Sequence, residues 1–153
     1  MKPSFSIMNQ NYPAKESREA LFTDIGWTNL IDNKAFWDTC AIRMSIALRL
    51  SSVPFSSGNM RAHAGKIKGK IIQIRQGDLS RELKRLWGGP EIYKGDHEAR
   101  KAIGNRKGVV SFFRIEGGSG GHIDLISLGP HGFQRCARAC AFSALTVWFW
   151  ELP

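Results

Sequence analysis

The stretch Trp37-Asp38-Thr39-Cys40-Ala41-Ile42-Arg43-Met44-Ser45 decides the fold, because a polar segment turns here into an apolar helix. Asp38 and Thr39 are residue types that cap the N-terminus of a helix, so Cys40 is predicted to lie in the first turn. From Cys40 to about Leu50, apolar side chains fall on nearly every side of the helix. We therefore expect this helix to be buried in the core and to hold Cys40 rigidly against a sheet.

The position of Cys40 favours a reactive thiol. A thiol at the start of a helix faces backbone N–H groups without partners and the positive end of the helix dipole, so we expect a lowered pKa for Cys40. The backbone N–H of Cys40 is then also expected to help bind an oxyanion. The alternative interpretation is that Cys40 is a small buried apolar residue, as cysteines in apolar helices usually are.

A histidine far along the chain is the candidate partner of this thiol. The run Gly117-Gly118-Ser119-Gly120-Gly121-His122 opens a predicted strand over 122–127. A cysteine that opens a helix, followed by a histidine that opens a strand, is the chain order of papain-like cysteine hydrolases. In such a site Cys40 attacks an amide carbonyl, and His122 pairs with the thiolate and protonates the leaving amine.

A third group is expected to orient the His122 imidazole. Side chains alternate along a strand, so Asp124 shares a face with His122 and is the nearest candidate. Gln134 and His131 are alternatives for the same role. Asp124 is equally open to two other interpretations, a contact with substrate or exposure to solvent.

The remaining pattern predicts an α+β fold in a single domain over 1–153, in which the nucleophile helix packs on a mostly antiparallel sheet. No internal repeat, low-complexity segment or linker divides the chain. Helices are predicted over 16–22, 40–50, 78–87 and 96–103, and strands over 70–75, 109–115, 122–127 and 144–150.

The charge balance points to an anionic partner. Lys and Arg number 22 against 13 Asp and Glu, which gives a net charge of +9. Nucleic acid, an acidic membrane and an anionic cell wall are all attracted by such a surface. The basic residues are dispersed, apart from a small cluster at Lys66–Lys70, and no nucleic-acid-binding motif accompanies them. A non-enzymatic nucleic-acid-binding protein is therefore kept as the alternative, while neither nucleic acid nor an inserted membrane is the expected partner.

The cysteine count and the termini limit the other possibilities. No apolar segment of a secretory signal follows Met1–Phe5, so we expect a protein made in the cytoplasm without a signal peptide. Of the three cysteines, Cys136 and Cys140 could form a disulfide or remain two buried thiols. A zinc site built from these two with His122 and His131 has no standard ligand spacing, so no metal or other cofactor is expected.

Several motifs together resemble the type VI secretion amidase effectors, in an order and spacing that run through nearly the whole chain. The motifs are Asp38–Ser45, Ile103–Val110, Gly120–Leu125 and Trp150–Pro153. The resemblance implies a papain-like cell-wall endopeptidase fold, with the nucleophile at Cys40 and the general base at His122. It further implies an antibacterial toxin that is injected into the periplasm of a neighbouring bacterium by the type VI secretion apparatus. There it would cleave peptidoglycan peptides, and a cognate immunity protein would block it.

The resemblance also carries a departure from the family pattern. Some members have a Cys-x-x-x-Cys disulfide near the C-terminus, which Cys136 and Cys140 match, with the orienting aspartate between the two cysteines. Here Ala137-Arg138-Ala139 offers no carboxylate. The chain is thus expected to belong to the third or fourth subgroup. The favoured bond is diaminopimelate–D-Ala and the alternative is γ-D-Glu–diaminopimelate, while a protein substrate is a further alternative.

Overall fold

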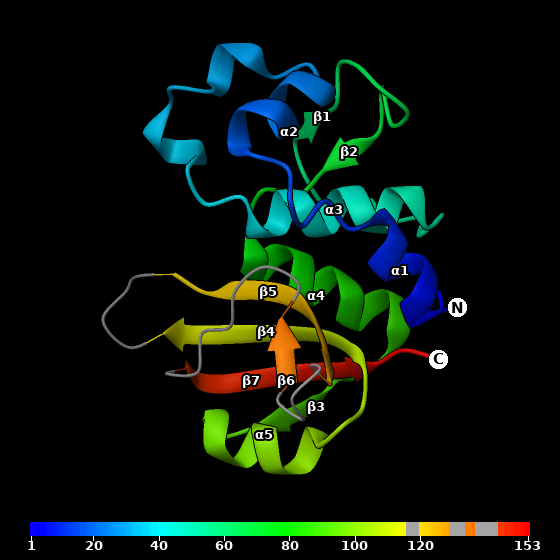
Figure 1. The fold of residues 1–153 in the computed structure, drawn as a ribbon, viewed down its shortest axis with the longest axis vertical. Helices are drawn as coiled ribbons and strands as arrows, with labels where there is room; N and C mark the ends of the chain where they lie inside the picture. The colour runs from blue at the N-terminus through cyan, green and yellow to red at the C-terminus, as the bar shows by residue number, and fades with distance from the viewer. Residues whose placement is uncertain (116–119, 129–133, 137–143) are drawn as a thin grey trace.

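Five antiparallel strands form the main sheet, in the order β3-β7-β4-β5-β6 (Figure 1). Their bounds are β3 Glu91–Tyr93, β7 Ala144–Glu151, β4 Gly108–Ile115, β5 His122–Leu128 and β6 Gln134–Cys136. The computed structural model describes residues 1–115, 120–128, 134–136 and 144–153. β4 and β7 pair along nearly their whole length, so they form the centre of the sheet. The expected α+β class with an antiparallel sheet is confirmed.

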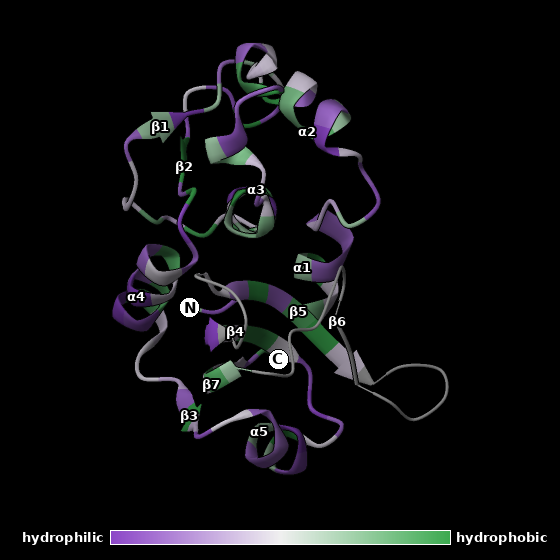
Figure 2. Ribbon diagram, turned by 90° about the vertical axis from the view of Figure 1, so that its left-hand side faces the viewer, coloured by the Kyte–Doolittle hydropathy of each residue, from purple (hydrophilic) through white to green (hydrophobic). Residues whose placement is uncertain are grey.

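Helix α3 (Cys40–Leu50) is the buried helix that the sequence predicts, with the same bounds. Every residue from Cys40 to Leu48 is buried, including Arg43 and Ser45. In Figures 1 and 2 the helix lies next to β5, beyond the edge of the main sheet, and not flat on either face. Its N-terminal end and the beginning of β5 lie on the same side of the molecule, which brings position 40 towards position 122.

The two faces of the sheet are covered by different helices. α4 (Gln76–Trp87) packs Leu79 and Leu83 on the face that carries Ile123 and Leu125 of β5. α5 (Asp96–Ile103) covers the opposite face, which carries Ile126 of β5. Because side chains alternate along a strand, His122 and Asp124 belong to the α5 face.

Helix α1 (Phe5–Asn11) lies beside α3, and its Met8 belongs to the same apolar cluster as residues of α3 and the main sheet. A separate layer lies above α3 (Figure 1). It contains α2 (Arg18–Asp24), the short helices η1 (Thr28–Leu30) and η2 (Lys34–Phe36), and the two-stranded sheet of β1 (Met60–Arg61) and β2 (Ile71–Ile72). Its core gathers around the buried Trp27 and includes Ile42 and Ile46 of α3. The Phe5 N–H donates to the Pro153 carbonyl at 2.7 Å, which holds the two termini together (Figure 1).

The structure differs from the sequence predictions at several elements. Helix α4 begins at Gln76 and not at Asp78, which lies in its first turn. The predicted strand 70–75 is shortened to Ile71–Ile72, because the backbone of Gln73 bonds the Ser45 hydroxyl of α3 and not a neighbouring strand. Helix α1 was not predicted. In the part of the chain that the structure describes, no helix has both the length and the apolar composition to cross a bilayer.

The glycine before His122 has a packing role. A Cβ on Gly121 would overlap the Phe112 carbonyl oxygen and the Gln76 side chain, which reaches this point from α4. A Cβ on the neighbouring Gly120 would meet nothing within 4 Å. The start of β5 can therefore approach β4 and α4 only because position 121 has no side chain.

We predict that Gly121→Ala lowers the free energy of unfolding by about 1–3 kcal/mol, because the added methyl group must displace backbone atoms. The matched variant Gly120→Ala is expected to change it by less than about 0.5 kcal/mol. Urea unfolding followed by circular dichroism measures both. Equal stability of the two variants would contradict the close approach at position 121.

Candidate active site

The Cys40 thiol lies against the edge of β5. Cys40 is 6% exposed and belongs to the same apolar cluster as Ile123. The backbone N–H groups of Ile123 and Ala41 form hydrogen bonds with the thiol. The Ile123 N–H can do so because β6 pairs with Ile126–Leu128, the second half of β5, so the first half is left for α3. The sulfur atom thus lies near Ile123, the residue that follows His122 in β5.

The expected lowering of the Cys40 pKa is wrong for this structure. The pKa of Cys40 is raised to about 12, mainly by burial and additionally by the charge of Asp38. The hydrogen bonds from the Ile123 and Ala41 N–H groups lower it, but desolvation is the larger effect. The pattern of a helix start predicts the N–H groups correctly, but it does not predict how completely the thiol is shielded from water.

The expectation that the Cys40 N–H is without a partner is also wrong. This N–H donates to Oδ1 of Asp38 at 3.1 Å, so it has a partner in this structure. Thr39 is the N-cap residue by position, but its side chain makes no capping hydrogen bond. Asp38 therefore satisfies the backbone at the start of α3 and at the same time places a carboxylate near the thiol.

His122 and Asp124 form a hydrogen-bonded pair. Nε2 of His122 lies 3.0 Å from Oδ2 of Asp124, and Oδ1 of Asp124 accepts the Leu125 N–H at 2.7 Å. The Asp124 side chain is fully buried, whereas that of His122 is 15% exposed. The Phe112 ring stacks on the imidazole with an interplanar angle of 11°. Because Nε2 is held by Asp124, Nδ1 is the ring nitrogen that remains for a reaction with the thiol.

The other predicted site residues lie outside what the structure describes. These are His131 and Cys140, together with the side chains of Gln134 and Cys136 in β6. The expectations for a disulfide, for a zinc site and for the alternative orienting groups all depend on them. Within the described ranges, no group of three His, Cys, Asp or Glu residues is arranged to hold a metal ion.

Sequence reasoning missed two residues that support the site from α1 and α3. Arg43 is fully buried, and its guanidinium donates to the Thr39 hydroxyl at 2.9 Å and to the Pro13 carbonyl at 2.6 Å. Tyr12, next to Pro13, is also buried. The signal that could have found Arg43 is a charged residue within a helix that is otherwise apolar on all sides, since such a charge must be paired inside the protein.

The comparison with protein families shows to which family the chain belongs. Residues 36–150 match the model of the type VI secretion system amidase effector protein 4, Tae4. The chain belongs to the Tae4 family. The family resemblance inferred from the motifs is thereby confirmed, and the chain is an effector of a type VI secretion system. The sequence matches none of the curated proteins with which it was compared.

Solved Tae4 structures share the fold of this Tae4-family chain. Tae4 from Enterobacter cloacae is 21% identical, with a TM-score of 0.79 over 100% of this chain and 98% of that one. Tae4 from Salmonella Typhimurium, in complex with Tai4, is also 21% identical, with a TM-score of 0.77 over 100% of both chains. At this identity, the similarity shows a common fold.

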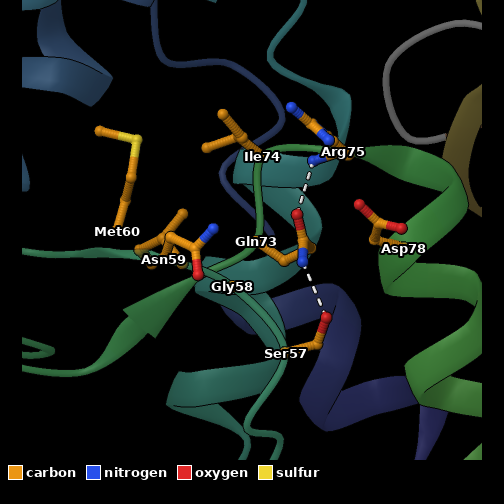
Figure 3. Close-up of a pocket in the computed structure, with 9 residues that line it drawn as sticks. Ser57, Gly58, Asn59, Met60, Gln73, Ile74, Arg75 and Asp78 are labelled. Carbon is orange, nitrogen blue, oxygen red and sulfur yellow. Dashed lines mark hydrogen bonds between the residues drawn. The ribbon is translucent and has the colours of Figure 1, made fainter.

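Two cavities of this Tae4-family chain lie away from Cys40. One of about 240 Å³ is lined by residues 57–60, 72–75 and Asp78, and Figure 3 shows how Gln73 shapes it. The Gln73 amide donates to the Ser57 hydroxyl at 2.8 Å and accepts the Arg75 N–H at 3.0 Å. The other, of about 580 Å³, lies between α1, α2 and the segment of Gly65–Ile67. Neither is lined by the candidate catalytic residues.

We predict that Asp38→Asn lowers the pKa of Cys40, because the negative charge of the Asp38 carboxylate raises this pKa in addition to burial. The rate of alkylation by iodoacetamide as a function of pH measures this pKa, and the midpoint should move to lower pH. Asp32→Asn, at an exposed position, is the matched control and should leave the midpoint unchanged. An unchanged midpoint in Asp38→Asn would show that its charge does not act on the thiol.

Proposed function

We propose that this Tae4-family chain is a cysteine amidase that hydrolyses peptide bonds of bacterial peptidoglycan, with Cys40 as nucleophile and His122 as general base. The observation that carries the proposal is that Cys40 packs in the same cluster as Ile123, the residue next to His122 on β5, whose N–H acts on the thiol. This packing brings the sulfur to the residue next to an imidazole whose other nitrogen is held by a buried carboxylate. The base His122 and the orienting group Asp124 both belong to β5, and the nucleophile Cys40 lies against the edge of this strand.

The first half of the reaction forms a thioester. Nδ1 of His122 takes the proton of the Cys40 thiol as the sulfur attacks the amide carbonyl carbon. Because burial keeps the thiol protonated, this transfer is coupled to the attack, and the Ile123 and Ala41 N–H groups stabilise the negative sulfur. The tetrahedral intermediate collapses, the carbon–nitrogen bond breaks, and the proton on His122 passes to the leaving amine.

The second half restores the enzyme. His122 removes a proton from a water molecule, whose oxygen attacks the thioester carbonyl. The carbon–sulfur bond breaks, the proton returns to the sulfur, and a carboxylic acid leaves. Asp124 holds the imidazole through Nε2 in both halves and stabilises the imidazolium that forms in each. The net reaction is an amide and water giving an acid and an amine.

Peptidoglycan is the substrate that best fits the charge and the family. A net charge of +9 attracts an anionic wall, and the family consists of amidase effectors of a secretion system that delivers its cargo to target cells. The periplasm is the compartment in which such a substrate is met. Between the two candidate bonds, we favour diaminopimelate–D-Ala over γ-D-Glu–diaminopimelate.

A cognate immunity protein is the proposed inhibitor. Related Tae4 chains from Enterobacter cloacae and Salmonella Typhimurium were solved in effector–immunity complexes with Tai4. We also propose that residues 1–153 form one domain, because α1 and the C-terminus are joined by a backbone hydrogen bond and α1 contacts α3.

Digestion of purified sacculi tests the function. Wild-type protein should release soluble peptides, and mass analysis of the new termini identifies the bond. Cys40→Ala should abolish the release, and His122→Ala should slow it by about 10²–10⁴-fold, as expected for loss of a general base. His97→Ala, an exposed histidine on α5, is the matched control and should keep the wild-type rate. Undiminished release by Cys40→Ala would exclude the proposed nucleophile.

A further inference from the structure

Tyr12 places a phenol hydroxyl inside the protein without a well-formed hydrogen bond. It follows the last residue of α1, is 6% exposed, and belongs to the apolar cluster that contains Cys40 and Ile123. Its hydroxyl oxygen is buried, and among the residues that the structure describes no atom meets it at hydrogen-bond distance and angle. Burying a hydroxyl without a partner costs about 1–3 kcal/mol. A phenylalanine would avoid this cost, so the hydroxyl needs an explanation.

The groups around this hydroxyl are those of the candidate active site. Burial raises the pKa of Tyr12, and the nearby Asp124 and Cys40 raise it further, whereas Arg43 lowers it. Asp124 acts on Tyr12 both as a charge and as a side-chain hydrogen-bond acceptor. The contact between the two side chains is thus close, although it does not have the geometry of a full hydrogen bond in this structure. A small movement of either side chain would complete it.

The backbone around Tyr12 is fixed on both sides. Arg43 of α3 donates to the Pro13 carbonyl at 2.6 Å, and the Ala14 N–H donates to the Tyr12 carbonyl at 2.9 Å. On the other side, the Asn11 amide donates to the Ser51 hydroxyl at 3.1 Å. These bonds tie the N-terminal segment to both ends of α3. Tyr12 is therefore presented to Asp124 by a rigid part of the fold.

We propose that Tyr12 is a positioning residue of the active site, whose hydroxyl donates a hydrogen bond to the Asp124 carboxylate and so adjusts how strongly Asp124 supports His122. This inference rests on the proposed function. It assigns a role in the site to the N-terminal segment, which lies outside residues 36–150 that match the family. It also supplies a second polar group behind His122 in a chain whose residues 137–139 offer no carboxylate.

The proposal makes a signed prediction for His122. A hydrogen bond to a carboxylate withdraws negative charge from it, so Asp124 stabilises the imidazolium less while Tyr12 donates to it. The Leu125 N–H still holds Asp124 in place when the Tyr12 hydroxyl is removed. Tyr12→Phe should therefore raise the pKa of His122 and should leave the packing of the ring unchanged.

The test is an NMR titration of the His122 imidazole in full-length wild-type protein, Tyr12→Phe and Tyr93→Phe. Tyr93 is the matched control, because its hydroxyl bonds Glu91 at 2.8 Å on β3, far along the sheet from β5. We expect a higher His122 pKa in Tyr12→Phe alone.

An unchanged or lowered His122 pKa in folded Tyr12→Phe overturns the proposal. If that variant does not fold, 3-fluorotyrosine incorporated into Tyr93→Phe protein decides the question, since Tyr12 is then the one tyrosine of the two that remains. The more acidic phenol is a stronger donor, so the His122 pKa should fall, and no change would overturn the proposal. The titration needs no substrate. A wild-type protein that fails to digest sacculi would therefore refute the proposed function without affecting this result.

Discussion

The rest of the structure depends on the packing of the first turn of α3 against β5. This contact is made along the half of β5 that does not pair with β6. The Ile123 N–H would pair with another strand in a continuous sheet, but here it bonds the Cys40 thiol. The helix can hold this position because it is buried along nearly its whole length and is bonded through Ser45 to the backbone of Gln73. Helix and strand are thus positioned by the core, and the thiol and the imidazole follow.

Buried polar groups make the electrostatics of the site unusual. Cys40 and Arg43 in α3 and Asp124 in β5 are all buried. Desolvation disfavours the charged form of the Cys40 thiol, so the thiol stays protonated although it begins a helix. Arg43 pairs instead with the Thr39 hydroxyl and the Pro13 carbonyl, and it thereby connects α3 with the N-terminal segment. The hydrogen bonds of Arg43 and Asp124 offset part of the free-energy cost of burying them, and they also fix the positions of these side chains.

The fold of this chain is shared with its relatives, whereas the residue that orients the histidine can differ. The same architecture occurs in Tae4 structures that are only 21% identical. Yet residues 137–139, where some relatives carry an orienting aspartate, contain no carboxylate. In our proposal this role belongs to the buried Asp124, which bonds His122 from two residues along the same strand. Local spacing on a strand can thus provide an orienting residue without any change of fold.

The sequence by itself determined the bounds of α3 and α5, the strands β4, β5 and β7, the α+β class and the family. Apolar periodicity and glycine positions are local properties, and they are visible in one dimension. Only the tertiary structure decided that α3 lies at the edge of β5 and that the Cys40 N–H bonds Asp38. It also decided that Tyr12, which follows the unpredicted helix α1, is buried in the same apolar cluster as Cys40. The thiol shows the difference best: a helix start lowers its pKa, but burial by distant segments raises it, and burial is a property of the whole fold.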